Sequence, residues 1–129
     1  GNRDIPKWKK KYLLKNYLEV NAVLDAAPQI KACLMGHHHV SKVQTVNGLH
    51  YIASPATVQY PHAFRTITIN DNEARLEFHQ VRAQGIIELG QHKLLMSKNA
   101  EEYAGGSAGD ILAYCHGGKG DNDVVLRLR

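Results

Sequence analysis

The stretch that decides the fold is Ile30-Lys31-Ala32-Cys33-Leu34-Met35-Gly36-His37-His38-His39-Val40. An apolar run of this length that breaks at Gly36 predicts a buried β-strand whose end opens into a loop. If the extended backbone continues past the glycine, the side chains of His37 and His39 point to one side and that of His38 to the other. Two neutral imidazoles at the mouth of a buried strand are suited to binding zinc, iron or nickel.

The residues on either side of this stretch predict an α/β protein. Apolar residues recur at helical spacing from Tyr12 to Ala27, where Pro28 ends the pattern, so a helix leads directly into the strand. After the histidines, Lys42 to Val46 and Leu49 to Ser54 flank Asn47-Gly48, a pair that readily adopts the positive φ angles of a tight turn. We therefore expect a β-hairpin there.

Further strands and helices are predicted along the rest of the chain. Phe64 to Ile69 is rich in β-branched residues, and apolar and polar residues alternate from Ala74 to Gln80, as in an antiparallel strand with one wet face. Beyond Val81 the pattern weakens. We expect short helices over 100–104 and 108–116 and a last strand from Val124 to Leu128. The segment 86–89 is short and apolar, and 94–96 could belong to a helical turn or a strand. The glycine-rich stretches 105–109 and 117–120 are expected to be loops.

The composition is that of an ordinary globular protein. The 129 residues suffice for one domain, or part of one, and 43% of them are hydrophobic and 22% charged. No apolar run approaches the roughly 20 residues of a membrane span, and the N-terminus has no secretory pattern. We therefore expect a soluble, cytoplasmic protein with no membrane partner, and free thiols at Cys33 and Cys115.

Basic residues gather at the start of the chain and account for much of the net charge of +4. Lys7, Lys9, Lys10, Lys11 and Lys15 cluster around two aromatic residues, and such a patch can hold nucleic acid or an anionic substrate. A short lysine run is more often a solvated face, so nucleic acid is not the expected partner.

The histidines and the residues that follow them resemble the calcineurin-like metallophosphoesterases. The last metal motif of that family, Gly-His-x-His after a buried strand, is matched by Gly36, His37 and His39, with His38 at the variable position. The sequel looks like the branch that includes bacterial class III cyclic-nucleotide phosphodiesterases, on the strength of Asn47-Gly48, Ser54-Pro55-Ala56-Thr57, Gln59, Pro61 and Phe64-Arg65. The resemblance divides a single domain or fragment, 1–129, into a metallophosphoesterase-like segment, 12–81, and a C-terminal extension, 82–129, whose structure the sequence leaves open.

The resemblance implies a hydrolase that uses two divalent ions, Mn, Fe, Zn or Ni, to cleave a phosphodiester or a phosphomonoester. A hydroxide that bridges the ions attacks phosphorus, and His37 and His39 would each be a ligand to one ion. Their other ring nitrogens would be held by a carbonyl or a carboxylate. His38, Gln59 and Arg65 are weaker candidates for contact with a phosphoester or cyclic-nucleotide-like substrate.

The sequence also departs from the family. The Asp-x-His and Gly-Asp-x-x-Asp motifs are absent, and Gly1-Asn2-Arg3-Asp4 has arginine where the third motif, Gly-Asn-His, has histidine. The chain therefore looks like the C-terminal half of a metallophosphoesterase αββα fold, a partial β-sandwich with flanking helices. We expect the catalytic acid and the other ligands in the missing N-terminal part, so this chain alone would be inactive and need not bind an ion.

Two other functions stay open. A non-catalytic α/β module that associates with a second copy through exposed sheet surface would contain the same elements, and its histidines would only cap a strand end. A basic nucleic-acid-binding domain would rest on the lysine-rich start of the chain.

Five further histidines lie outside the motif, and one of them, His116, ends a predicted helix, where it can complement the helix dipole. His50, His62, His79 and His92 stand singly, without a second ligand at a useful spacing. We expect them as surface or half-buried side chains.

Overall fold

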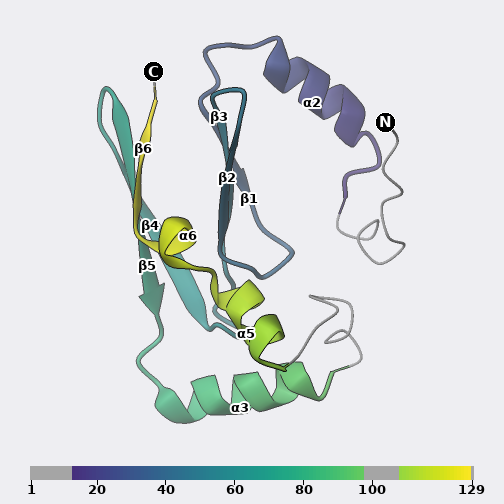
Figure 1. Cartoon of the computed structure of the whole chain (residues 1–129), viewed down its shortest axis with the longest axis vertical. Coiled ribbons are helices and arrows are strands. Elements are labelled where there is room, and N and C mark those ends of the chain that lie inside the picture. The colour runs from purple at the N-terminus through teal and green to yellow at the C-terminus, as the bar shows by residue number, and fades with distance from the viewer. Residues whose placement is uncertain (1–12, 98–107, 129) are drawn as a thin grey trace. The chain divides into compact units, whose positions relative to one another are not determined.

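The computed structural model describes residues 13–97 and 108–128 and divides the chain into two compact units, Gly1–Ile30 and Lys31–Arg129. Helix α2 (Tyr17–Asp25) belongs to the first unit, and all other described elements belong to the second (Figure 1). The predicted helix from Tyr12 to Ala27 is confirmed over the nine residues of α2. Tyr12 itself lies outside the described residues.

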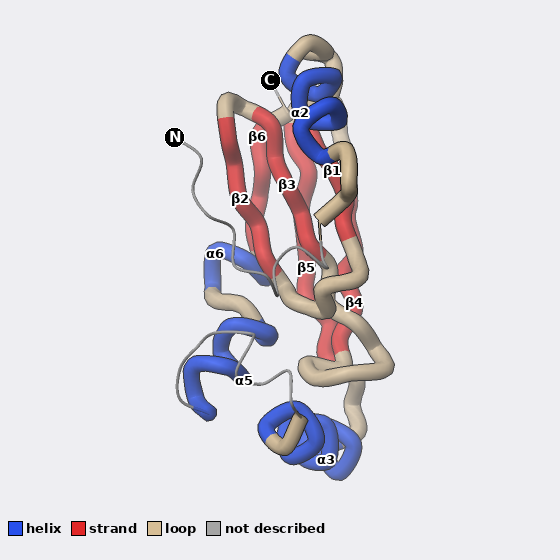
Figure 2. The backbone as a smooth tube through the Cα atoms, turned by 90° about the vertical axis from the view of Figure 1, so that its right-hand side faces the viewer, coloured by secondary structure: helices blue, strands red, loops and turns tan. Residues whose placement is uncertain are grey.

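Two three-stranded sheets make up the framework of the second unit, and Figure 2 shows their strands in red. The first sheet has the order β1-β3-β2 and the second the order β4-β5-β6. β1 runs parallel to β3, and all the other pairs are antiparallel. The strands are β1 (Ala32–Met35), β2 (Lys42–Val46), β3 (Leu49–Ala53), β4 (Ala63–Ile69), β5 (Glu73–Gln80) and β6 (Val124–Arg127).

The predicted hairpin is present between β2 and β3. Val46 pairs with Leu49, and Asn47 and Gly48 form the turn with φ angles of 50° and 81°. A two-residue turn with both φ angles positive matches the right-handed twist of the strands that it joins. The chemistry of these two residues therefore fixes the register between β2 and β3.

The two sheets face each other across a shared apolar core. Ile52 of β3 clusters with Ala74 and Leu76 of β5 and with Leu126 of β6, and all four side chains are buried. Side chains from both sheets thus fill one layer, which is the packing of a β-sandwich. This arrangement confirms the predicted mixed α/β fold with a partial sandwich.

A second apolar core joins the histidine loop to α3 (Gln84–Leu95) and α5 (Ala108–His116). Burial raises the pKa of the Cys115 thiol in this core to about 11, so this cysteine stays a neutral thiol. The C-terminal extension therefore packs within the second unit. The buried residues of this core are Val40, Tyr60, Ile87, Leu94, Ile111 and Cys115.

The extension contains both predicted and unexpected helices. The predicted helix 108–116 is confirmed as α5, and α3 includes both the apolar segment 86–89 and residues 94–95 of the segment that could have been helix or strand. The predicted helix 100–104 lies outside the described residues. None of the helices in the described part of the chain has the length and apolarity needed to cross a membrane.

The prediction that the strand at residues 30–35 is buried is wrong. Leu34 and Met35 are 65% and 40% exposed. The reason is that β1 lies at the edge of its sheet, where β3 is the only described strand that pairs with it. An apolar run predicts that its side chains are buried against another surface, but that surface need not belong to the described residues of this chain.

The prediction of a loop at 117–120 is wrong for its second half, because Lys119 and Gly120 belong to the short helix α6 (Lys119–Asn122). Gly117, with a φ of 76°, ends α5, and the side chain of Asp121 then accepts a hydrogen bond from the Gly118 amide at 3.0 Å. This side chain satisfies an amide at the start of the helix that would otherwise lack an acceptor.

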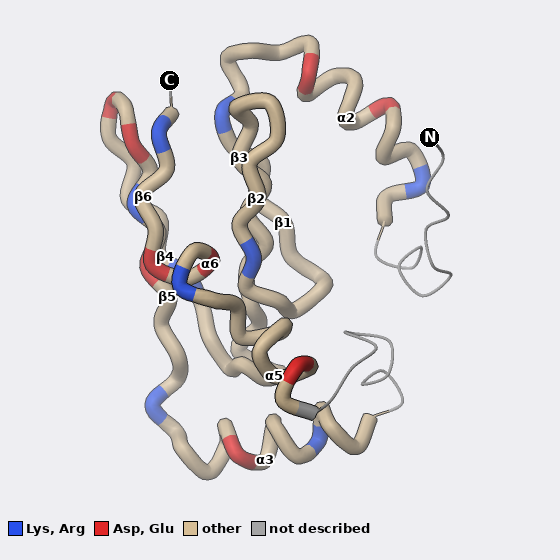
Figure 3. Tube along the Cα trace, viewed as in Figure 1, with Lys and Arg blue, Asp and Glu red and all other residues tan. Residues whose placement is uncertain are grey.

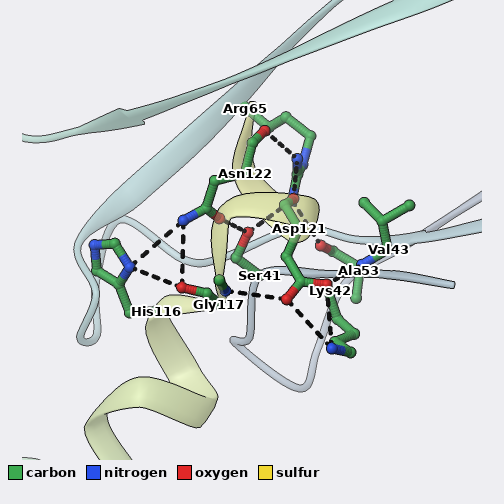
Figure 4. A network of polar contacts seen from close by, with 10 residues as sticks. Ser41, Lys42, Val43, Ala53, Arg65, His116, Gly117, Asp121 and Asn122 are labelled. Atoms are coloured by element: carbon green, nitrogen blue, oxygen red, sulfur yellow. Dashed lines mark hydrogen bonds and ion pairs between the residues drawn. The ribbon is translucent and has the colours of Figure 1, made fainter. Parts of the chain in front are cut away.

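A network of polar contacts, which we call the polar latch, ties α6 to the start of β2 (Figure 4). Its central carboxylate is Asp121, which accepts hydrogen bonds from the amides of Val43 and Gly118, each at 3.0 Å. The ammonium group of Lys42 lies 3.2 Å from the same carboxylate. The side chains of the polar latch are Ser41, Lys42, Arg65, Asp121 and Asn122.

The environment of Asp121 favours its charged form. Burial alone would raise the pKa of this carboxyl group, but the two amide donors and Lys42 outweigh burial and lower the pKa below its ordinary value. The carboxylate is therefore ionised at neutral pH and holds two segments that lie far apart in the sequence.

Arg65 of β4 completes the polar latch from the second sheet. One guanidinium nitrogen donates to the carbonyls of Asp121 at 2.8 Å and Asn122 at 3.1 Å, and another donates to Ser41 Oγ at 2.7 Å. Ser41 in turn donates to the side-chain oxygen of Asn122 at 2.6 Å. These contacts position Ser41, which follows the histidines by two residues.

We expect the core between the sheets to dominate stability. Ile52→Ala removes a fully buried side chain and should lower the free energy of unfolding by about 2–5 kcal/mol. The matched control is Ile69→Ala in β4, where the side chain is 70% exposed and the cost should stay below about 0.5 kcal/mol. Urea denaturation measures both losses, provided that the slope of the free energy of unfolding against urea concentration is the same in each variant. Equal losses in the two variants would contradict the sandwich core.

Asp121 should make stability depend on pH. Because its pKa is lowered in the folded state, its contribution is present above the unfolded pKa of about 4 and is lost as the pH falls through the folded pKa. Asp121→Asn should therefore cost about 1–3 kcal/mol at pH 7 and progressively less at acid pH. Urea titrations across this pH range provide the test, with Asp71→Asn in an exposed turn as control. A loss that is independent of pH would argue against an ionised Asp121.

Candidate metal centre

The three histidines lie in a turn and not in a continued strand. β1 ends at Met35, and the amide of His38 donates back to the carbonyl of Gly36 at 2.8 Å. His37 and His39 adopt left-handed backbone conformations, with φ angles of 70° and 56°. The predicted alternation of these side chains along extended backbone is therefore wrong, because a left-handed residue turns the chain out of the pleat.

The left-handed backbone of His37 and His39 is energetically unfavourable and therefore informative. A residue with a side chain pays about 1–3 kcal/mol to remain in a sparsely populated region of backbone space. Such residues persist where surrounding structure holds them, and they concentrate at functional sites. Two in one three-residue segment mark this turn as a place where side-chain position is set by the fold.

The turn is held firmly at both ends. At its start, the carbonyl of Met35 accepts a hydrogen bond from the amide of Ser54 at 2.9 Å. At its end, Val40 is buried in the second apolar core, and the amide of the buried Ser41 donates to the carbonyl of Cys115 at 3.0 Å. The first sheet, the second apolar core and α5 thus fix the turn that carries the histidines.

His39 is oriented by a second side chain. Its Nδ1 lies 2.7 Å from the Oε1 of Gln59, in the loop before β4. An amide oxygen can only accept, so Nδ1 carries the hydrogen and Nε2 retains a free lone pair. This is how metal-binding histidines are commonly oriented, with one ring nitrogen held by an oxygen and the other directed at the ion.

The other two histidines have different surroundings. His37 is exposed, whereas His38 is half-buried. The ring of His38 packs edge-on against that of Tyr114 in α5, with 5.9 Å between ring centroids. This contact gives His38 a packing role, and its contact with substrate stays a prediction.

Arg65 and Gln59 were both weaker candidates for contact with substrate, but the structure gives them different partners. The guanidinium of Arg65 donates to oxygens of Ser41, Asp121 and Asn122 in the polar latch. Burial lowers its pKa, and the carboxylates of Asp121 and Asp123 oppose that effect. Arg65 is therefore a structural residue here, and its contact with substrate stays a prediction.

The ligand set is small. Across residues 13–97 and 108–128, no group of three or more His, Cys, Asp or Glu side chains is placed to hold a metal ion. Because a catalytic ion normally has three protein ligands, His37 and His39 would need further ligands from outside these residues. What the structure does bring together is one candidate ligand, His39, and the oxygen that orients it.

Two histidines outside the motif are more deeply placed than predicted. His50 is 8% exposed and bridges Thr45 and the carbonyl of Arg127, at 2.8 Å and 2.7 Å. His62 is 7% exposed and lies against Gly90 of α3. The expectation of surface or half-buried positions is wrong for both, because tertiary partners far away in the sequence enclose them.

Comparison with known proteins yields a distant relative. Over 79 residues the chain is 32% identical to a 3′,5′-cyclic-nucleotide phosphodiesterase of Nostoc sp. (strain PCC 7120), and the match covers 60% of this chain and 30% of that protein. No protein-family model matches the chain, and no solved structure matches it. The chain thus spans less than a third of the length of this curated relative, and it is similar to one part of a phosphodiesterase.

Proposed function

We propose that this chain supplies part of the active centre of a metal-dependent phosphoesterase, which cleaves a phosphodiester or a phosphomonoester. The observation that carries the proposal is the hydrogen bond between His39 Nδ1 and Gln59 Oε1, which leaves Nε2 available to an ion. The similarity to a protein named as a phosphodiesterase supports the same class of reaction.

The residues fit two roles at such a centre. His37 and His39 would each donate a ring nitrogen to one of two divalent ions, for which Mn, Fe, Zn or Ni are suitable. When bound, such ions supply a hydroxide nucleophile at neutral pH and neutralise charge on the phosphoryl oxygens. Gln59 keeps His39 in the tautomer that can ligate, and the anchored turn keeps both rings at the end of β1.

A 3′,5′-cyclic nucleotide is the substrate class that we favour. The support comes from the name of the Nostoc protein, whose match to this chain includes only part of its length. His38 is a candidate for a contact near the reacting phosphate, because it follows one proposed ligand and precedes the other. A cytoplasmic location stays a prediction of the sequence.

We further propose that the centre is completed by other chain segments. The open side of β1 is where we expect them, because Leu34 and Met35 are exposed there and a parallel edge strand is normally covered. The same edge favours a second candidate function, a non-catalytic module that associates with another copy. In that case His37 and His39 would serve only to end the strand.

Charge gives less support to a nucleic-acid-binding function. Lys15 is the one described member of the lysine cluster at the start of the chain, and the others lie outside the described residues. Elsewhere, acidic and basic residues are interspersed along the second sheet and α3 (Figure 3). A nucleic-acid interface usually needs a continuous basic stripe.

The ligand assignment predicts that phosphodiester turnover differs between this chain and a longer protein that carries the remaining ligands. With Mn²⁺ and bis(p-nitrophenyl) phosphate, the chain alone should show little turnover, because two ligands hold an ion weakly. In the longer protein, His37→Ala and His39→Ala should each remove bound metal and abolish turnover. His92→Ala, at an exposed position of α3, is the matched control.

Metal content and turnover distinguish the outcomes. Strong hydrolysis by the chain alone would disprove the proposed need for other ligands. Full activity and full metal content in a double His37→Ala, His39→Ala variant would sink the site assignment and leave the self-associating module as the better explanation.

Gln59 should tune the affinity of the centre for metal. Gln59→Leu removes the acceptor that orients His39 and should weaken Mn²⁺ binding by about 10- to 100-fold in the longer protein. Gln59→Glu keeps an acceptor at the same reach and should retain most of the affinity. Calorimetric titration with Mn²⁺ compares the two. Equal affinity in the Leu variant and the unsubstituted protein would show that Gln59 does not act through His39.

A further inference from the structure

Ser41 closes the histidine turn and is completely buried, although it carries a hydroxyl group. Its amide donates to the carbonyl of Cys115 near the end of α5, at 3.0 Å. Its hydroxyl group donates to the side-chain oxygen of Asn122 at 2.6 Å and accepts a hydrogen from Arg65 at 2.7 Å. A buried hydroxyl group that both donates and accepts has little freedom to move, so tertiary partners set the position of this residue.

The segment that joins α5 to α6 lies directly against Ser41. At Gly117, a β-carbon would overlap the carbonyl oxygen of Ser41, and the φ of 76° at this position also favours glycine. Beyond this close approach, Asn122 turns its side-chain oxygen back to the hydroxyl group of Ser41 (Figure 4). The end of α5 and the end of α6 thus enclose the exit of the histidine turn.

The position of Ser41 matters for His39 because the backbone between them is short and strained. His39 has a φ of 56°, an unfavourable conformation that persists where its surroundings hold it. On its C-terminal side these surroundings are Val40, which is buried in the second apolar core, and Ser41. If Ser41 were released, residue 39 could relax to a negative φ, and its Nδ1 would turn away from Oε1 of Gln59.

We propose that Ser41 and Asn122 are positioning residues of the metal centre: their hydrogen bond holds His39 in the backbone conformation that directs Nδ1 at Gln59 and leaves Nε2 to a divalent ion. The proposal rests on the proposed function above and deepens it, because it assigns part of the affinity for metal to α6. Neither residue is a proposed ligand, so they act on the ion through His39.

Two substitutions of Asn122 test this assignment in the 129-residue chain without metal. Asn122→Leu keeps the size of the side chain and removes the acceptor of the Ser41 hydroxyl group. Asn122→Asp keeps an acceptor, and His116 Nδ1, which lies 3.4 Å from the amide nitrogen of Asn122, can donate to the new oxygen. His39 should lose its fixed ring tautomer and its positive φ in the Leu variant and retain both in the Asp variant.

NMR spectroscopy measures both properties of His39. The shifts of its ring nitrogens at mildly alkaline pH identify the tautomer, and a short distance between its amide and α hydrogens identifies the positive φ. Leu76→Ala is the matched control, because it removes a side chain from the core between the sheets, away from the histidine turn, and should leave both signals unchanged. If Asn122→Leu does not fold, Ser41→Ala, which removes one oxygen atom and should have the same effect, takes its place.

Metal binding is the second measurement. In the longer protein that carries the remaining ligands, Asn122→Leu should weaken Mn²⁺ binding by about 10- to 100-fold in calorimetric titration, as loss of a residue that orients a ligand commonly does. Asn122→Asp should retain most of the affinity.

The outcomes separate this proposal from the proposed function. An unchanged His39 in the Leu variant, equal changes in the Leu and Asp variants, or the same changes in Leu76→Ala would overturn the positioning role. Unaltered Mn²⁺ affinity of Asn122→Leu, in a longer protein that binds Mn²⁺, would overturn it as well. If the unsubstituted longer protein binds no Mn²⁺ while His39 responds as expected, the phosphoesterase function is overturned and the control of His39 by Asn122 is supported.

Discussion

The guanidinium group of Arg65 is the polar contact that ties the two sheets of the second unit to α6. It projects from the second sheet and meets three segments from elsewhere in the chain: the exit of the histidine turn at Ser41, the end of β3 at Ala53, and the two carbonyls at the end of α6. Only arginine presents several donors in a rigid plane that can serve separate acceptors at once. Lysine at this position would keep the charge but could satisfy fewer of these oxygens.

This contact also explains how the C-terminal extension belongs to the fold. Residues 82–129 contribute β6 to the second sheet, α3 and α5 to the second apolar core, and α6 to the polar latch. The histidine turn is therefore supported by residues about 80 positions further along the chain, as the bond between Ser41 and Asn122 shows. The extension supports the candidate site even though it contributes none of its proposed ligands.

Local chemistry determined which parts of this structure could be predicted. The hairpin at Asn47-Gly48 and the alternating strand β5 follow from the φ preferences of two residues and from a period of two, which act over a few positions. The exposure of Leu34 could not be foreseen, because it depends on which strands lie beside β1. Nor could the turn at His37 to His39, because left-handed backbone at a histidine is imposed by its surroundings.

The candidate site shows the same division. The resemblance pointed to His39 and to Gln59 separately, but their hydrogen bond joins residues 20 positions apart and required the fold. His62 was set aside because it stood alone, and an isolated histidine in a sequence carries no sign of a tertiary partner. What the sequence indicates well is the chemical type of a group. Its orientation and its neighbours come from packing.

The pairing of His62 with Gly90 has a consequence for how this chain can change. Alanine at position 90 would restore about 0.5–1 kcal/mol to the helix but would overlap the imidazole. The order of substitutions is therefore constrained by sterics: the ring at position 62 has to shrink before a side chain can enter at position 90. We therefore expect residues 62 and 90, which lie 28 positions apart, to change together in evolution or not at all. A more stable α3 with alanine at position 90 leaves no room for histidine at position 62.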